Sequence, residues 1–157
     1  MRPINNPFAG NSGFRCFACS PSNPVGLHLQ FYEDGDWVCA DWQPSWLYEG
    51  YQGIVHGGIQ STLLDEVASW AVNIKLHTSG VTVQMLTDYL KPLYSNESLV
   101  TAKAKVISLE GRLATLHTVL ESPEGNVFTE SDVKYHLFDR EKAQKRYGFP
   151  KDEGIFF

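Results

Sequence analysis

The sequence lacks long apolar runs and has no excess of basic residues. No stretch approaches the roughly 18 to 20 consecutive apolar residues of a membrane span, and no basic start leads into an apolar segment of the signal-peptide kind. The 13 Lys and Arg residues are outnumbered by 18 Asp and Glu residues, which gives a formal net charge of −5. Such a charge provides no general attraction to nucleic acid or to anionic lipid. We therefore expect a cytoplasmic protein with no nucleic-acid or membrane partner.

Cysteine is also scarce. Cys16, Cys19 and Cys39 are an odd number, which fits a reducing compartment better than a disulfide framework. Cys16 and Cys19 have the C-x-x-C spacing of half a zinc site, but no second ligand pair follows at the required spacing. His28 and Cys39 would complete four ligands only if the fold happened to bring them together. We therefore expect no metal ion, no redox chemistry at this pair and no cofactor.

The chain does contain enough apolar material for one core. Its 157 residues are 43% hydrophobic and 20% charged, which is typical of a single globular domain. Residues 1–24 are rich in Pro, Asn, Gly and Ser and predict an irregular leader. Residues 140–157 predict a short charged helical turn and a tail whose apolar end packs on the domain. Residues 1–157 are therefore expected to form one domain with a leader and a tail.

Hydrophobic periodicity predicts one long helix and six strands. From Gly57 onwards, apolar residues recur every three or four positions for about 20 residues, which indicates a mostly buried helix. Extended segments are predicted on both sides of it, at residues 25–33, 37–42, 81–90, 99–109, 113–121 and 127–138. Two strands, one helix and four more strands predict an α+β fold in which an antiparallel sheet of five or six strands curls around a single helix.

The junction that opens this helix carries the most distinctive residues. His56, Gly57 and Gly58 stand between loop and helix, and Asp65 and Glu66 place two carboxylates in an otherwise apolar segment. Amides at a helix N-terminus have no intrahelical acceptor and lie at the positive end of the helix dipole, so those of Gly57 and Gly58 can stabilise a developing oxyanion. The alternative is that the glycines only interrupt structure and both acids face solvent.

Three stretches of the sequence resemble a known family. They are Cys16 to Phe31, Tyr51 to Glu66 and Val81 to Pro92, and together they are similar to the hotdog-fold acyl-CoA thioesterases, particularly the phenylacetate-pathway-like group. The resemblance implies a hotdog fold and the hydrolysis of an acyl-CoA thioester, with acyl-CoA as the partner.

The resemblance also implies roles for individual residues. Asp65 matches the catalytic carboxylate of the family, and Gly57 matches the amide that polarises the thioester carbonyl. His56 matches the histidine beside that amide, and Thr82 matches a hydroxyl that helps to place water.

One position departs from the family pattern. Some members carry an asparagine in the loop before the histidine, where this chain has Gly50, so Gln52 or a backbone group would have to take its role. Tyr51, Gln52, Glu66 and Lys91 are the candidate substrate-binding residues. Lys91 follows the strand after the helix and can meet a CoA phosphate, although a solvated lysine is the alternative.

Helix geometry favours an active site shared between two chains. At about 1.5 Å per residue, Asp65 lies on the order of 10 Å along the axis from the amides of Gly57 and Gly58. A thioester carbonyl has to sit about 3 Å from both the amide donor and the attacking group. We therefore predict a homodimer, alone or as a dimer of dimers, in which one subunit supplies the amides and the other supplies Asp65 and Thr82.

The residues leave several alternatives open. Asp65 can act as a general base on water or as a nucleophile that forms an anhydride. On the same fold, a hydratase or dehydratase would need a histidine and a carboxylate placed for proton transfer at the acyl chain, and His56 with Asp65 is the one such pair. A non-catalytic acyl-CoA-binding module would keep the pocket without needing Asp65.

Overall fold

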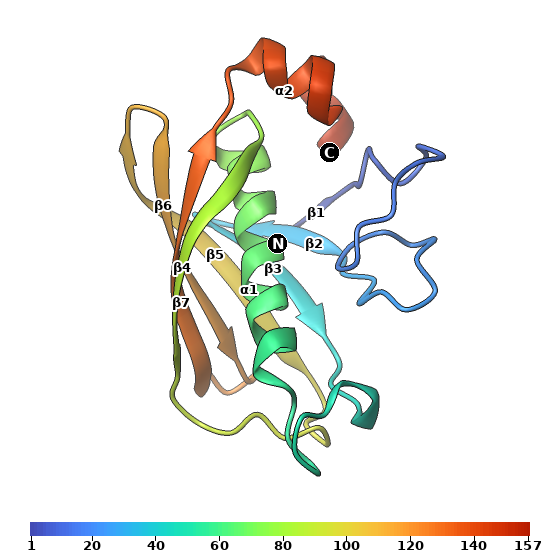
Figure 1. Ribbon diagram of the computed structural model, residues 1–157, viewed down its shortest axis with the longest axis vertical. Helices are drawn as coiled ribbons and strands as arrows, with labels where there is room; N and C mark the ends of the chain where they lie inside the picture. Colours follow the sequence, from blue (N-terminus) through green and yellow to red (C-terminus); the bar gives the residue numbers. More distant parts are fainter.

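One antiparallel sheet curls around a long helix (Figure 1). The computed structural model describes residues 1–157. The sheet has the order β1-β2-β3-β5-β6-β7-β4. Its strands are β1 (Arg2–Ile4), β2 (Phe31–Asp34), β3 (Trp37–Trp42), β4 (Gly80–Tyr89), β5 (Val100–Glu110), β6 (Leu113–Glu121) and β7 (Val127–Leu137). The helices are α1 (Gly57–Lys75) and α2 (Arg140–Tyr147), with short 3-10 helices η1 (Trp46–Tyr48) and η2 (Glu153–Phe156). None of these helices has the length and apolarity to cross a membrane.

The predicted architecture, one long helix wrapped by an antiparallel sheet, is confirmed. The sheet has seven strands, where five or six were expected, because Arg2–Ile4 of the supposedly irregular leader pairs with β2. The strand predicted at residues 25–33 begins only at Phe31. Leu27 and Leu29 are buried, but their amides donate to the leader carbonyls of Phe17 and Ala18 at 2.9 Å. Their alternation therefore reflects burial beside the leader instead of pairing in the sheet.

The core lies between α1 and the concave face of the sheet. Leu63, Leu64 and Val67 of α1 are fully buried there. The strands beneath the helix present small buried side chains, among them Ala40, Ala102, Ala104 and Ala114. Small side chains let a helix lie close to a sheet while the larger helix residues fill the interior to native density.

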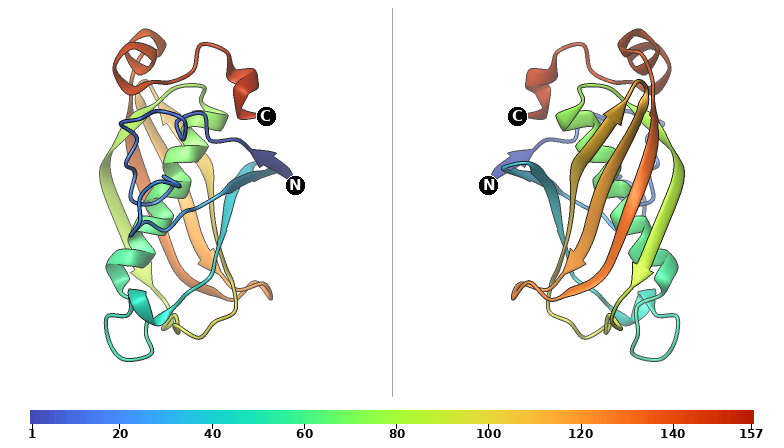
Figure 2. Two further views of the ribbon diagram at one scale, coloured as in Figure 1. Left: turned by 90° about the vertical axis from the view of Figure 1, so that its right-hand side faces the viewer. Right: turned by 90° about the vertical axis from the view of Figure 1, so that its left-hand side faces the viewer.

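The leader and the tail cover the side of α1 that faces away from the sheet. In the left view of Figure 2 the leader crosses in front of α1, with the sheet behind the helix. Trp70 of α1 is stacked on Phe31 at a centroid distance of 4.4 Å and makes edge contacts with Phe8 and Phe156. Phe156 is buried, so the tail packs on the domain as predicted, while Ile155 stays exposed.

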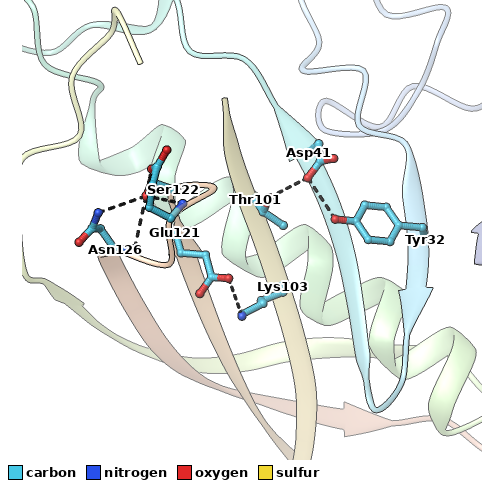
Figure 3. A network of polar contacts seen from close by, with 8 residues as sticks. Tyr32, Asp41, Thr101, Lys103, Glu121, Ser122 and Asn126 are labelled. Carbon is cyan, nitrogen blue, oxygen red and sulfur yellow. Dashed lines mark hydrogen bonds and ion pairs between the residues drawn. The ribbon is translucent and has the colours of Figure 1, made fainter. Parts of the chain in front are cut away.

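The convex face of the sheet is polar. Asp41 of β3 accepts hydrogen bonds from the hydroxyls of Tyr32 at 3.1 Å and Thr101 at 2.7 Å, which links β2, β3 and β5 (Figure 3). Lys103 of β5 forms an ion pair with Glu121 of β6 at 2.6 Å. Asp41, Thr101 and Lys103 alternate along β3 and β5 with the buried Ala40, Ala102 and Ala104, so the two faces of these strands have opposite polarity.

Candidate functional site

The N-terminus of α1 is organised by His56. Its side chain caps the helix, and Nδ1 accepts a hydrogen bond from the Gly58 N–H at 2.8 Å. A Cβ at position 58 would lie 3.0 Å from that nitrogen, so glycine allows the close approach of the imidazole. Gly57 is the first residue of the helix, and its N–H has no acceptor within it. Of the two amides predicted from the sequence, that of Gly58 is therefore taken by His56, and that of Gly57 is left without an acceptor in the helix.

A cleft of about 550 Å³ opens at this junction. The loop before α1, the first turn of the helix and the end of β4 line it, through Gly50, Tyr51, Ile54, Val55, His56, Gly57, Gln60, Tyr89, Leu90, Lys91 and Pro92. Two of the predicted substrate-binding residues, Tyr51 and Lys91, therefore lie at the cleft, and Tyr51 is 83% exposed. Gln52 is exposed and is not among the lining residues.

Two polar lining residues, Tyr89 and Gln60, were not identified from the sequence. Tyr89 donates its hydroxyl to the Gly57 carbonyl at 3.0 Å and shares a 2.6 Å hydrogen bond with Ser61. Gln60 is buried, donates to the carbonyl of Val55 at 3.0 Å and accepts a hydrogen bond from Thr129. Both side chains fasten the first turn of α1 to its surroundings, which fixes the position of the Gly57 amide.

Gly50 occupies the place where some relatives were expected to carry an asparagine. A Cβ at this position would lie 3.1 Å from Cδ2 of His56. The imidazole of His56 therefore occupies the space that a longer side chain at position 50 would need.

Asp65 lies in the middle of α1 and is held by two hydroxyls. Its Oδ1 accepts hydrogen bonds from Thr82 at 2.7 Å and from Tyr135 at 2.8 Å. The Tyr135 hydroxyl also donates a hydrogen bond to the Asp65 carbonyl oxygen at 2.9 Å. The other carboxylate oxygen, Oδ2, accepts no hydrogen bond from the chain. The arrangement fixes the carboxylate and leaves one oxygen for a ligand or a water molecule.

The sheet places both hydroxyls. Thr82 of β4 and Tyr135 of β7 are direct partners in the ladder, and the register shifts between Thr82 and Gln84. Such a bulge changes the direction of neighbouring side chains. Burial, followed by the nearby charge of Asp65, raises the pKa of Tyr135, so the phenol keeps its proton and acts as a donor. Tyr135 was not predicted as a site residue from the sequence. The only feature that could have indicated it is a tyrosine at an inward-facing position of an alternating strand.

Asp65 lies outside the cleft at the start of α1. Neither Asp65 nor Thr82 lines the cleft that contains His56 and Gly57. Asp65 is eight positions after Gly57 in the helix, which corresponds to about 12 Å at 1.5 Å per residue. Within one chain, the amide and the carboxylate therefore do not converge on a single reacting carbonyl.

Glu66, predicted to bind substrate, lies elsewhere. It is partly buried beneath the leader, where it accepts hydrogen bonds from the Cys16 thiol at 3.5 Å and from the Trp70 indole at 3.1 Å. Burial, together with the charge of Cys16, raises the pKa of Glu66 to about 7. A side-chain hydrogen bond from Cys19 lowers the pKa of the Cys16 thiol to about 5. This cluster is separate from the cleft, although Glu66 directly follows Asp65 in the chain.

Comparisons with known proteins identify the family and the fold. A family model described as Thioesterase superfamily matches residues 52–129, which include His56, Gly57, Asp65 and Thr82. Among solved structures, a thioesterase superfamily protein is similar at 25% identity with a TM-score of 0.70. That match covers 77% of this chain and 62% of the other, so this chain spans less than two thirds of its length.

Two further structures are similar over most of their length. A thioesterase from Haemophilus influenzae has 22% identity and a TM-score of 0.65, with 72% of this chain and 80% of the other covered. A hypothetical thioesterase from Streptococcus pneumoniae, solved with coenzyme A, has 21% identity and a TM-score of 0.65, with 71% and 87% covered. No curated protein matches the sequence. The hotdog fold predicted from the resemblance is confirmed.

Proposed function

Because this chain belongs to the thioesterase superfamily, we propose that it hydrolyses the thioester of an acyl-CoA to a free acid and CoA. The observation that carries the proposal is the carboxylate of Asp65. Two hydroxyl donors hold its Oδ1, and its Oδ2 is free of protein partners. A fixed carboxylate with one open oxygen suits an attacking group or a general base.

The reaction can follow either of two routes from this arrangement. In the first, Oδ2 takes a proton from water, the water oxygen attacks the thioester carbon, and the C–S bond breaks to release the CoA thiolate. In the second, Oδ2 itself attacks, the thiolate leaves, and water then hydrolyses the resulting anhydride. Both routes pass through an oxyanion, which the Gly57 N–H stabilises. Thr82 and Tyr135 orient the carboxylate, and His56 positions the amide through its cap on Gly58.

The separation of these groups supports a homodimer with two shared sites, alone or as a dimer of dimers. β4 lies at the end of the sheet, so one of its edges is unpaired. It exposes apolar side chains, including Val83 at 55% and Leu86 at 68%. Open apolar edges are usually covered in native proteins, and a two-fold axis can pair identical edges.

Antiparallel pairing of two β4 strands would bring the right groups together. Thr82, which contacts Asp65, is near the start of β4, and Tyr89, which contacts Gly57, is at its end. In an antiparallel pair the start of one strand lies toward the end of its partner. Asp65 of one subunit would then face the Gly57 cleft of the other. Lys91 at the cleft is positioned for a CoA phosphate, and Tyr51 for the substrate beside it.

The test is a hydrolysis screen of purified protein on aliphatic and aromatic acyl-CoAs, with released CoA followed by a thiol reagent. We expect Asp65→Asn to lower kcat at least about 100-fold, as expected for loss of a general base or nucleophile. Tyr135→Phe, which removes one donor to the carboxylate, should have an intermediate effect. Asp36→Asn is the matched control, because Asp36 is an exposed acid in the hairpin turn between β2 and β3. Full activity of Asp65→Asn, or no hydrolysis of any substrate by the natural chain, would overturn the proposal.

A further inference from the structure

Three potential ligand atoms meet where the leader crosses α1. Cys16 and Cys19 come from the leader, and Glu66 comes from the helix 50 residues after Cys16. The two sulfur atoms and a carboxylate oxygen all lie within 4.8 Å of one another. His28 and Cys39, the other residues that the sequence offered as ligands, are not part of this group. The third ligand is therefore one that spacing along the chain did not reveal.

The spacing of these atoms suits a single small cation. The Cys16 sulfur lies 3.5 Å and 3.6 Å from the two carboxylate oxygens of Glu66. With metal–sulfur distances of about 2.3 Å and metal–oxygen distances of about 2.0 Å, the sulfur–oxygen edge of a tetrahedral zinc site is about 3.5 Å long. An ion held by Cys16 and Glu66 would therefore need little movement of these two side chains, and the Cys19 sulfur lies within 4.8 Å of both.

A backbone N–H and an indole N–H orient two of the three ligand side chains. The backbone N–H of Cys19 points to the Cys16 sulfur at 3.4 Å, and the indole N–H of Trp70 donates to Glu66 at 3.1 Å. Hydrogen bonds of this kind fix metal ligands in protein sites and commonly change affinity 10- to 100-fold.

The charges around Glu66 also favour a bound cation. Glu66 is partly buried and forms no ion pair with any Lys, Arg or His of the chain. A carboxylate removed from water is stabilised by a cation or by losing its charge. Two thiols beside it favour a thiophilic ion over Mg²⁺ or Ca²⁺, which prefer all-oxygen ligands.

We propose that Cys16, Cys19 and Glu66 bind one divalent ion of the zinc type, with a fourth position open to water. A cleft of about 480 Å³, lined also by Phe14, Ser69 and Trp70, gives solvent access to this position. The ligands are thiolates, so binding releases any proton that a thiol still carries. The ion would fasten the leader to α1 immediately beside Asp65.

The test uses the full chain, reduced and stripped of metal with a chelator that is then removed. Zn²⁺ is titrated in competition with a chromophoric chelator, and Co²⁺ is added separately to record its absorption spectrum. We expect one Zn²⁺ per chain, and thiolate-to-cobalt and tetrahedral d–d bands with Co²⁺. Cys16→Ser, Cys19→Ser and Glu66→Gln should each weaken Zn²⁺ binding at least about tenfold. Cys39→Ser is the matched control, because Cys39 is a buried free cysteine outside the cluster.

A second readout separates loss of binding from loss of folding. Zn²⁺ should raise the midpoint of thermal unfolding in the natural chain and in Cys39→Ser, because a ligand of the folded state stabilises it, and should leave the midpoint of Cys16→Ser unchanged. Three results would overturn the proposal: no Zn²⁺ bound by the folded, reduced chain, equal binding by Cys16→Ser, or a Cys16–Cys19 disulfide in place of metal in protein purified without oxidant.

Discussion

At the scale of single residues, the neighbouring amides of Gly57 and Gly58 at the His-Gly-Gly junction have different hydrogen-bonding roles. His56 accepts a hydrogen bond from the N–H of Gly58 and thereby caps the helix, while the N–H of Gly57 has no acceptor in the helix and is the proposed oxyanion donor. Tyr89 holds the carbonyl of the same glycine from the opposite side. The amide is thus fixed before a substrate arrives, which is how a preorganised dipole stabilises a developing charge without a cost of reorganisation.

A pair of substitutions at Gly57 isolates this amide. Proline is tolerated at the first position of a helix, and His56 before it has φ −57 and ψ 134, an extended conformation that a following proline accepts. Gly57→Pro removes the N–H and should lower kcat about 100- to 1,000-fold, measured as CoA release.

The control for that change is Gly57→Ala. It keeps the N–H and adds a Cβ 3.3 Å from the ring of Tyr89. Its activity should fall much less than that of the proline variant. Equal losses in the two variants would mean that crowding at Tyr89, and not the missing amide, explains the effect.

At the scale of elements, β4 connects the two halves of the site. Its start carries Thr82 against Asp65, its end carries Tyr89 against Gly57, and its outer edge is open. The bulge after Thr82 adjusts the strand at the point where the carboxylate is held. One strand therefore serves both as the wall of the site and as the surface proposed for the partner subunit.

Charge on this edge should separate the subunits. Leu86→Lys places a lysine at a position of β4 that is 68% exposed in the single chain, where pairing with a second copy would bury it. We expect light scattering to show a shift from dimer to monomer and the hydrolysis rate to fall with it. Ile107→Lys is the control, because Ile107 is an apolar residue of β5 that is 50% exposed and lies away from the edge. A dimer that survives Leu86→Lys would place the interface elsewhere.

At the scale of the whole molecule, the distance between Gly57 and Asp65 on one rigid helix is the decisive quantity. Both residues belong to one continuous helix, Gly57–Lys75, whose rise keeps them about 12 Å apart. In the proposed mechanism, a carbonyl bound at Gly57 is therefore attacked by the carboxylate of another copy.

Mixing two inactive variants tests this shared site. Asp65→Asn retains its amide, and Gly57→Pro retains its carboxylate, so a mixed dimer contains one complete site. After subunit exchange, verified by native mass spectrometry of tagged chains, a random mixture should recover about a quarter of the natural activity, because half of the dimers are mixed and each has one of two sites. No recovery despite confirmed exchange would contradict the shared arrangement.

Local pattern in the sequence was sufficient for α1 and for most of the strands. Periodicity placed α1 from Gly57, and the alternating segments at residues 37–42 and 113–121 coincide with β3 and β6. The His-Gly-Gly motif and the following carboxylate identified Gly57 and Asp65 as candidates. These features are local, because the direction of each side chain repeats with the period of its own helix or strand.

The tertiary structure alone decided which distant residues meet. Tyr135 reaches Asp65 across 70 residues of sequence, and Glu66 reaches Cys16 across 50, so neither contact has a spacing that a motif could record. Alternation also misplaced the start of β2, because burial beside the leader produces the same pattern as a strand. The physical reason is that periodicity encodes which way a side chain points, whereas the order of strands and the path of the leader determine what it meets.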